Sequence, residues 1–150
     1  MNNATYDSTP WFSLKGITTE CKILDVYDGD TVTLAINLQG FGIVKLNCRL
    51  YGIDTEEMRG GTIESKVKAI SARNYLIYLL TDIHIPDDHK YSRDELRNKL
   101  TKSIKPITCS FDIMDKYGRP LITLFDNNKT NINNKMIEEN HANPYFGGTK

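Results

Sequence analysis

The sequence lacks an excess of charge of either sign, because 19 lysines and arginines balance 19 aspartates and glutamates. A protein that coats nucleic acid by neutralising many phosphates is usually basic. The balance therefore argues against a high-affinity, non-catalytic DNA coat. The sequence also lacks any apolar run close to the roughly 18 residues of a membrane span, so we expect no membrane partner.

Cysteine and histidine are scarce, with three of each in the chain. The cysteines are widely spaced inside strand-like runs, which favours small buried apolar residues over a disulfide or a zinc site. The histidines have no metal-ligand spacing, so we expect them on the surface. These six residues are Cys21, Cys48, Cys109, His84, His89 and His141.

A length of 150 residues fits one domain with a single hydrophobic core. Residues 1–14 are mainly polar, and we expect a flexible leader there, with Trp11 and Phe12 as candidate anchors, before a folded domain over residues 15–150. The leader lacks the basic start and apolar stretch of a secretory signal, which predicts an intracellular protein. We expect this protein to be a monomer.

Apolar and polar residues alternate in five segments, which is the pattern of half-buried strands. In the first segment, Cys21 and Ile23 fall on one face and Val26 falls on the other. Asp28-Gly29 and Gly40–Gly42 predict turns that join the first three strands into a meander. The predicted strands cover residues 16–26, 32–38, 44–50, 107–114 and 121–125.

Helical spacing appears between these strands and after them. Residues 62–80 predict a helix with a core-facing apolar stripe, and Ser92 with Glu95 forms a capping box that starts a second helix over 92–103. A short third helix is predicted near Met136, and the tail from Asn143 is predicted to be irregular. Together these elements predict an α+β, mainly β, fold: a five-stranded Greek-key OB-type barrel with two to three flanking helices. The expected stripe is Ile63, Val67, Ile70, Leu76, Ile77 and Leu80, and Leu96, Leu100 and Ile104 follow at four-residue steps.

The meander places two acidic turns at one edge of the barrel. Asp30 follows the first strand and Asp54 follows the third, so we expect their carboxylates to meet, with Thr55 and Glu57 alongside. Carboxylate, carbonyl and water oxygens suit a hard cation such as Ca²⁺ or Mg²⁺. Taken alone, each aspartate is more typical of turn chemistry, and it is the convergence that favours a metal site.

Arg49 and Arg119 are candidate phosphate ligands, because a guanidinium offers a planar fork to phosphate oxygens and stays charged. Arg49 precedes Asp54 by about 16 Å of straight strand at ~3.3 Å per residue, so the chain must bend, and Gly52 is the predicted place. Both arginines also fit an ordinary surface role. Tyr117 and Tyr145 suit stacking on a base or contact with a phosphate as well as they suit a rim or core position.

Three motifs, Asp28–Thr31, Arg49–Glu57 and Asp115–Arg119, together resemble the active-site signature of the staphylococcal nuclease (thermonuclease) family. The resemblance spans roughly residues 17–146. It implies an OB-type barrel with Ca²⁺ as cofactor, Mg²⁺ being less favoured. It also implies hydrolysis of phosphodiester bonds in DNA and RNA with little sequence preference, leaving 3′-phosphate ends.

The resemblance implies a role for each site residue. Asp30 and Asp54 would bind Ca²⁺ through their carboxylates, and Thr55 would bind it through its backbone carbonyl. Glu57 would orient or activate the attacking water. Arg49 and Arg119 would bind the scissile phosphate and stabilise its transition state. Tyr117 would line the nucleotide site.

The chain also departs from the family pattern. Glu56 replaces the usual proline, which frees the loop and adds negative charge near the metal, and Pro120 favours an extended backbone at Arg119. Residues 81–105 exceed the usual helix-to-strand connection and resemble an insertion. The family's last helix is shortened or missing after Tyr145.

Two other functions remain open from the sequence. A non-catalytic OB-fold module that binds nucleic acid or protein would be expected to lack some of the acids or arginines, and this chain retains the full set. The 81–105 segment could instead dock a protein partner through a basic face of Lys99, Lys102 and Lys105, although a solvated helix explains the same residues.

Overall fold

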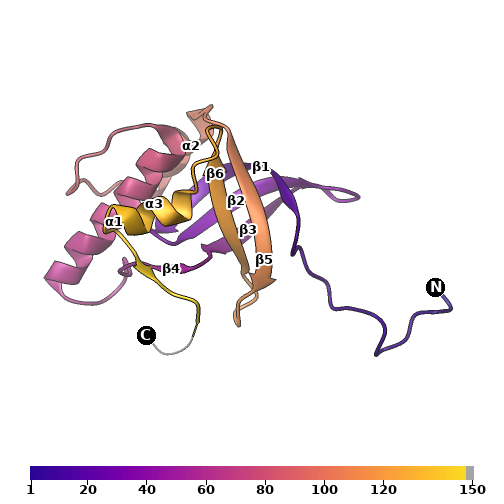
Figure 1. Ribbon diagram of the computed structural model, residues 1–150. Helices are drawn as coiled ribbons and strands as arrows, with labels where there is room; N and C mark the ends of the chain where they lie inside the picture. Colours follow the sequence, from indigo (N-terminus) through magenta and orange to yellow (C-terminus); the bar gives the residue numbers. More distant parts are fainter. Residues whose placement is uncertain (148–150) are drawn as a thin grey trace.

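The computed structural model describes residues 1–147 and contains a closed five-stranded barrel, shown in Figure 1. The strands are neighbours in the order β1-β2-β3-β6-β5, and this arrangement confirms the predicted α+β, mainly β, barrel of the OB type. Their bounds are β1 Thr18–Asp28, β2 Thr31–Leu38, β3 Gly42–Leu50, β5 Ile107–Met114 and β6 Pro120–Asp126.

The pairing explains how the barrel closes. Strands β1, β2 and β3 form the predicted antiparallel meander, and β5 is antiparallel to both β1 and β6. Closure comes from a parallel pairing of β3 with β6, in which Arg49 lies opposite Leu121. Parallel neighbours require a long crossover, and the chain between β3 and β6 supplies it with two helices and β5.

The first strand departs from strict alternation. Its pairing with β2 shifts between Ile23 and Asp25, which is the signature of a β-bulge. The extra residue resets the side-chain alternation, so Ile23 and Val26 are both buried in the core. The prediction that Val26 lies on the face opposite to Ile23 is therefore wrong.

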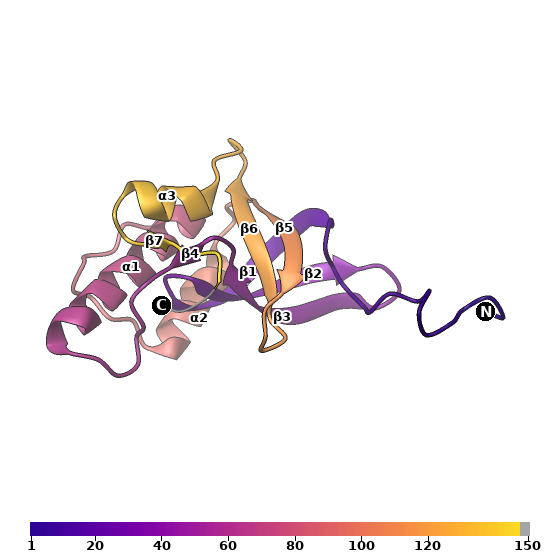
Figure 2. The same cartoon turned by 60° about the horizontal axis from the view of Figure 1, so that its bottom comes forward.

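Helix α1 (Ile63–Thr81) begins after Thr62, whose hydroxyl oxygen accepts a hydrogen bond from the Ser65 N–H at 3.1 Å. Its second half packs on the barrel and buries Leu76, Ile77 and Leu80. The core stripe was predicted too long, because Ile63 is 86% exposed and Val67 is 59% exposed. The first turns of α1 extend past the barrel, as Figures 1 and 2 show, and have no sheet to pack against.

Helix α2 (Arg93–Lys102) confirms the predicted capping box, with reciprocal bonds between Ser92 and Glu95. Leu96 and Leu100 are fully buried against the core. The 81–105 segment is therefore part of the packed domain. The helix ends before Ile104, which is 95% exposed and not on the helical stripe as expected.

The expected basic face of the 81–105 segment is only partly available. Lys105 has a side chain that is 15% exposed, and its ammonium donates to the Leu79 carbonyl at 2.9 Å and to Asp82 at 2.7 Å. Lys99 lies over the ring of Tyr91, 5.4 Å from its centroid. Lys102 is exposed, so a partner surface on this segment stays a prediction.

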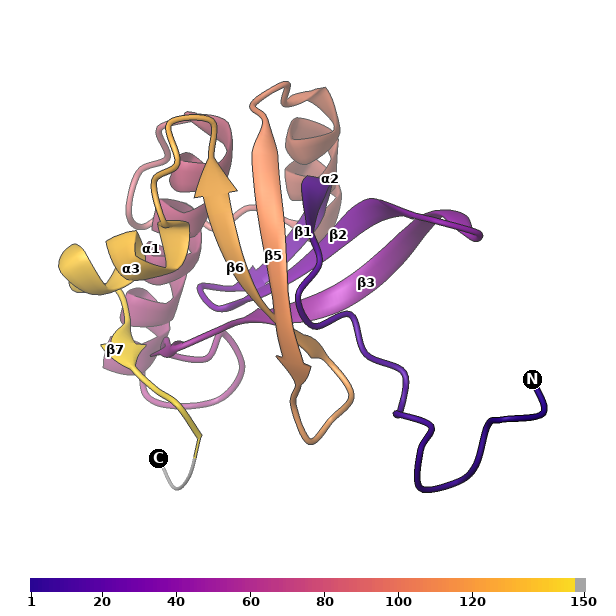
Figure 3. The ribbon, with the colours of Figure 1, turned by 45° about the vertical axis from the view of Figure 1, so that its right-hand side comes forward.

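The two ends of the chain differ from the sequence expectations. Leu14, the last residue of the expected leader, is buried in the core, whereas Trp11 and Phe12 are exposed on a segment that leaves the barrel in Figure 3. The tail from Asn143, predicted to be irregular, begins with strand β7 (Asn143–Pro144). Its last three residues, 148–150, lie outside the described part of the chain.

Helix α3 (Ile132–Glu138) confirms the short third helix. All three cysteines are free thiols; Cys48 and Cys109 are buried, as expected, whereas Cys21 is only half-buried. His84 and His89 are exposed, but His141 is half-buried and stacks on Tyr75 with ring centroids 4.6 Å apart. Over residues 1–147, the structure has no helix that is both long and apolar enough to cross a membrane.

Candidate active site

The turn between β1 and β2 meets strand β4 (Ile53–Asp54) at one edge of the barrel, as the meander predicts. Asp30 is 3% exposed in this turn. Its backbone carbonyl accepts from the Leu50 N–H at 2.8 Å, and its carboxylate accepts from the Thr55 N–H and the Thr31 hydroxyl at 3.1 Å each. Asp30 is thus fixed by its carbonyl and by both carboxylate oxygens.

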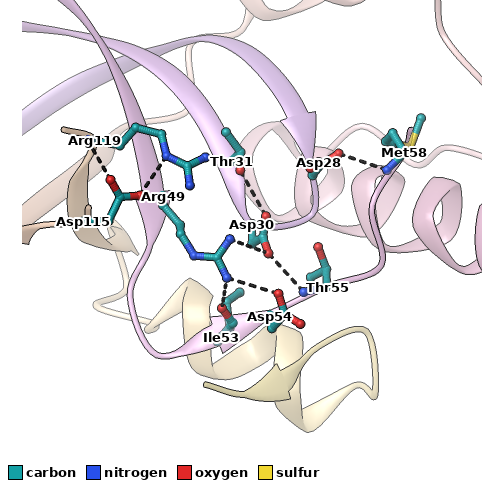
Figure 4. Close-up of polar contacts among 10 residues, drawn as sticks. All are labelled: Asp28, Asp30, Thr31, Arg49, Ile53, Asp54, Thr55, Met58, Asp115 and Arg119. Carbon is teal, nitrogen blue, oxygen red and sulfur yellow. Dashed lines mark hydrogen bonds and ion pairs between the residues drawn. The ribbon is translucent and has the colours of Figure 1, made fainter. Parts of the chain in front are cut away.

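Arg49 connects the two aspartates (Figure 4). Its Nη1 lies 3.3 Å from Oδ2 of Asp30, and its Nη2 lies 3.1 Å from Oδ1 of Asp54. Nη2 also donates to the Ile53 carbonyl at 3.2 Å. The expected bend is present, because Gly52 has φ of +80°, a left-handed conformation that favours glycine.

Tyr145 reaches this group through the short ribbon that β4 forms with β7. Ile53 pairs with Pro144, and the Tyr145 N–H donates to the Gly52 carbonyl at 2.9 Å. The tyrosine ring then lies against the guanidinium of Arg49, with Cζ 5.4 Å from the ring centroid. A short strand in the tail therefore places Tyr145 beside Arg49, and its contact with a substrate stays a prediction.

Arg119 lies at the end of the β5–β6 turn, two residues before Leu121, the β3-paired partner of Arg49. Its Nε donates to Oδ2 of Asp115 at 2.8 Å. The other oxygen of that carboxylate accepts the backbone N–H groups of Tyr117 and Arg119, each at 2.9 Å. Burial alone would raise the pKa of Asp115, but these donors outweigh burial and lower it.

Tyr117 and Glu57 occupy the edge of the candidate site. Tyr117 is 73% exposed, and its ring lies 5.5 Å from Cζ of Arg119. Glu57 is exposed in the loop that follows Thr55. Figure 4 shows two separate groups of contacts. Arg49 contacts Asp30 and Asp54, Arg119 contacts Asp115, and no drawn contact connects the first group with the second.

Asp28 is a site residue that sequence reasoning did not single out. It is 8% exposed and accepts the Met58 N–H at 3.2 Å. Burial raises its pKa to about 6, opposed by the Met58 N–H and reinforced by the charges of Asp30 and Glu57. The Asp-Gly-Asp turn was noted in the sequence, but alternation could not show that both of its acids point inward.

The same turn packs tightly against Thr55. A Cβ atom on Gly29 would lie 2.9 Å from Cγ2 of Thr55 and 3.0 Å from Cβ of Ala72. The Thr55 hydroxyl oxygen is buried and has no hydrogen-bond partner among the described residues. Close approach of the two turns therefore depends on glycine at this position.

Asn133 of α3 was also missed. Its amide nitrogen donates to the carbonyls of Tyr51 and Ile122, both at 2.9 Å, and its oxygen accepts the Leu124 N–H at 3.1 Å. These bonds hold the chain between β3 and β4 against β6. A polar residue within the apolar face of a short helix was the available signal.

The donor set suits a hard cation but is sparse. Asp30 and Asp54 bring two carboxylates within reach of one guanidinium, and Thr55 adds a carbonyl from the same strand end. Over residues 1–147, no group of three or more histidine, cysteine, aspartate or glutamate side chains is gathered to hold a metal. Two carboxylates and a carbonyl are the oxygen donors that a hard cation prefers, and such an ion would have to take water for its remaining ligands.

Neither the protein-family models nor the curated proteins include a significant match to this chain. The resemblance to the nuclease family therefore depends on the three motifs and on their placement in the barrel.

Proposed function

We propose that the protein is a Ca²⁺-dependent phosphodiesterase that hydrolyses DNA and RNA with little sequence preference. The main support is the position of Arg49, which lies between two carboxylates and under an aromatic ring. Hydrolysis of a phosphodiester requires a positive charge beside the phosphate, oxygen ligands that hold the metal ion and an aromatic surface for the flanking base. Mg²⁺ is a less favoured alternative to Ca²⁺.

The arginines would act on the phosphate. Hydrolysis builds negative charge on the phosphate oxygens, and preplaced guanidiniums stabilise that charge more in the transition state than in the ground state. Arg119 uses Nε for Asp115, so its orientation is fixed, and none of the contacts found among the described residues uses its terminal nitrogens. Those nitrogens can donate hydrogen bonds to phosphate oxygens without breaking the Asp115 ion pair.

The acids would supply the cation site and the base. Asp30 and Asp54 would hold Ca²⁺ with the Thr55 carbonyl, and a bound Ca²⁺ would supply positive charge to the phosphate oxygens. Glu57 lies two residues beyond Thr55 and is exposed, so it can contact a water molecule and take its proton. Tyr145 and Tyr117 would contact the nucleotide beside the two arginines.

A chelator assay tests the proposal. The full chain is incubated with single-stranded DNA or RNA and Ca²⁺, with and without an excess of chelator. We expect cleavage that the chelator abolishes and that Asp30→Asn strongly reduces. Absence of chelator-sensitive cleavage of either nucleic acid would contradict the proposal.

A non-catalytic OB-fold module is the alternative, and one observation favours it: the ligand set contains only two gathered carboxylates. Such a module would bind nucleic acid or a protein without turnover. Its binding would be unaffected by Arg119→Ala, whereas the phosphodiesterase would lose turnover with that substitution. Measuring binding and cleavage on the same variant separates the two functions.

A further inference from the structure

A basic pocket lies next to the candidate active site. Its volume is about 350 Å³, and it opens between the end of β1, the loop after Thr55, helix α1 and the start of α2. Met58 lines this pocket while its N–H binds Asp28 of the acidic turn, so the two sites are adjacent. Four cationic side chains line it: Arg59, Arg73, Lys90 and Arg93.

Arg73 is the buried cation of this pocket, with 7% exposure. Its Nε donates to the Val26 carbonyl at 2.9 Å and its Nη1 to the Tyr91 carbonyl at 3.3 Å. In the described part of the chain, no carboxylate lies within ion-pair distance of it. Buried charges are normally paired, so this guanidinium is suited to an anionic ligand from outside the chain.

The acidic side chain in the pocket does not cancel this charge. Asp25 lines the pocket and its charge acts on Arg73, but its Oδ2 also lies 2.9 Å from Nη2 of Arg97, so this one carboxylate is shared between two cations. Asp28, which does not line the pocket, also acts on Arg73, and the positive charge of Arg93 opposes the effect of both acids. The pocket therefore retains an excess of positive charge beside the proposed phosphate site.

Aromatic rings accompany the cations. Tyr27, which is 46% exposed, and Tyr91 both line the pocket. Proteins that bind single-stranded nucleic acid combine a positive groove with aromatic rings on which bases stack. A pocket for a free anion would not need these rings.

We propose that this pocket is a second subsite for single-stranded nucleic acid, which binds a phosphate through Arg73, Lys90 and Arg93 and a base through Tyr27. That the ligand is a nucleic-acid strand rests on the proposed function, whereas the binding of a phosphate group in this pocket does not. Lys90 and Arg93 belong to the 81–105 segment, so this segment would extend the substrate path beyond the scissile phosphate.

The test measures binding of a labelled single-stranded DNA of about 10 nucleotides, a length within the range that an OB fold covers. Fluorescence anisotropy is recorded over a salt series, with chelator present and the DNA checked for integrity. The test variant is Lys90→Gln with Arg93→Gln. The matched control is Lys15→Gln with Lys102→Gln, which removes the same charge from exposed positions outside the pocket.

Loss of one phosphate contact should make the slope of log affinity against log salt shallower by about 0.7 for a single strand. We expect this change in the test variant and not in the control. Tyr27→Leu should weaken binding at least about fivefold, which is the lower end of a lost base stack. If the slope of log affinity against log salt is the same in the test variant as in wild type, the pocket is not a subsite for single-stranded nucleic acid.

Titration with inorganic phosphate, followed by the backbone amide signals of residues 90–93, distinguishes a strand from a free phosphate ligand. Signal shifts with an unchanged DNA slope and no effect of Tyr27→Leu would assign the pocket to a small phosphate-bearing ligand. No response to phosphate and no slope change would refute the site altogether. Binding with the expected slope change but no Ca²⁺-dependent cleavage would contradict the phosphodiesterase and leave the subsite standing.

Discussion

Replacing Arg49 with methionine should destabilise the protein because it leaves two carboxylates facing each other. The side chains of Arg49, Asp30 and Asp54 are 15%, 4% and 25% exposed. Methionine keeps the apolar stem of the arginine, so the variant removes mainly the charge, its three polar contacts and its contact with the Tyr145 ring. The destabilisation then measures how strongly the cation holds the acidic turn against β4.

The loss of unfolding free energy in Arg49→Met should lie between two known limits. Breaking a buried ion pair by removing one partner costs about 3–5 kcal/mol, whereas an exposed pair contributes about 0–1 kcal/mol. Because Arg49 and Asp54 remain partly accessible, we expect a loss of about 2–3 kcal/mol in the free energy of unfolding. For a domain of this size, that loss lowers Tm by about 4–12 °C.

Urea unfolding followed by far-ultraviolet circular dichroism, with chelator present, is the appropriate assay. Fluorescence is less suitable, because the single tryptophan, Trp11, is 86% exposed in the folded chain. A double-mutant cycle with Asp30→Asn should give a coupling energy of about 1–2 kcal/mol. Arg97→Met is the matched control, since Arg97 pairs with Asp25 through a side chain that is 51% exposed. If Arg49→Met cost no more than Arg97→Met, or the coupling energy were zero, the described role of Arg49 would be wrong.

Three further substitutions test other parts of the structure. The folded pKa of Asp28, about 6, exceeds the ordinary value of 3.8, so folding loses stability as pH rises between these values. Asp28→Asn should therefore stabilise the metal-free protein at pH 7 by on the order of 2 kcal/mol, and this advantage over wild type should disappear below pH ~4 in urea titrations. If the stability difference between variant and wild type were the same at both pH values, the burial of the Asp28 charge would be refuted. Gly29→Ala should cost about 1–3 kcal/mol of unfolding free energy, because its Cβ would press on Thr55 and Ala72; thermal unfolding unchanged from wild type would contradict this packing. Leu96→Ala should cost about 2–5 kcal/mol in the same measurement, and a near-neutral effect would show that the 81–105 segment is not part of the core.

Much of the site follows from the sequence because it depends on topology. Two tight turns fix three antiparallel strands, and a meander of this kind must bring Asp30 to Asp54. The bend at Gly52 could be predicted from chain length alone, since a straight strand would keep Arg49 too far from Asp54. The capping box of Ser92 and Glu95 likewise located helix α2.

The remaining features depend on tertiary contacts that alternation does not encode. The bulge in β1 turns Val26 inward, and nothing in the residue pattern marks where an extra residue is inserted. Tyr145 reaches Arg49 only because β7 pairs with β4, and a two-residue strand gives no periodic signal. Ile63 and Val67 are exposed because α1 is longer than the barrel surface it packs on, and the sequence of the helix does not show where that surface ends.

The most direct test of the proposed catalysis compares two adjacent glutamates. Both Glu56 and Glu57 are exposed in the same loop, so Glu56→Gln matches Glu57→Gln in charge, size and exposure. With single-stranded DNA and saturating Ca²⁺, we predict that Glu57→Gln lowers kcat by on the order of 10²–10⁴, as loss of a positioned general base does, while Glu56→Gln has little effect. Equal kcat values for the two variants would remove Glu57 from the mechanism and contradict the proposed phosphodiesterase site.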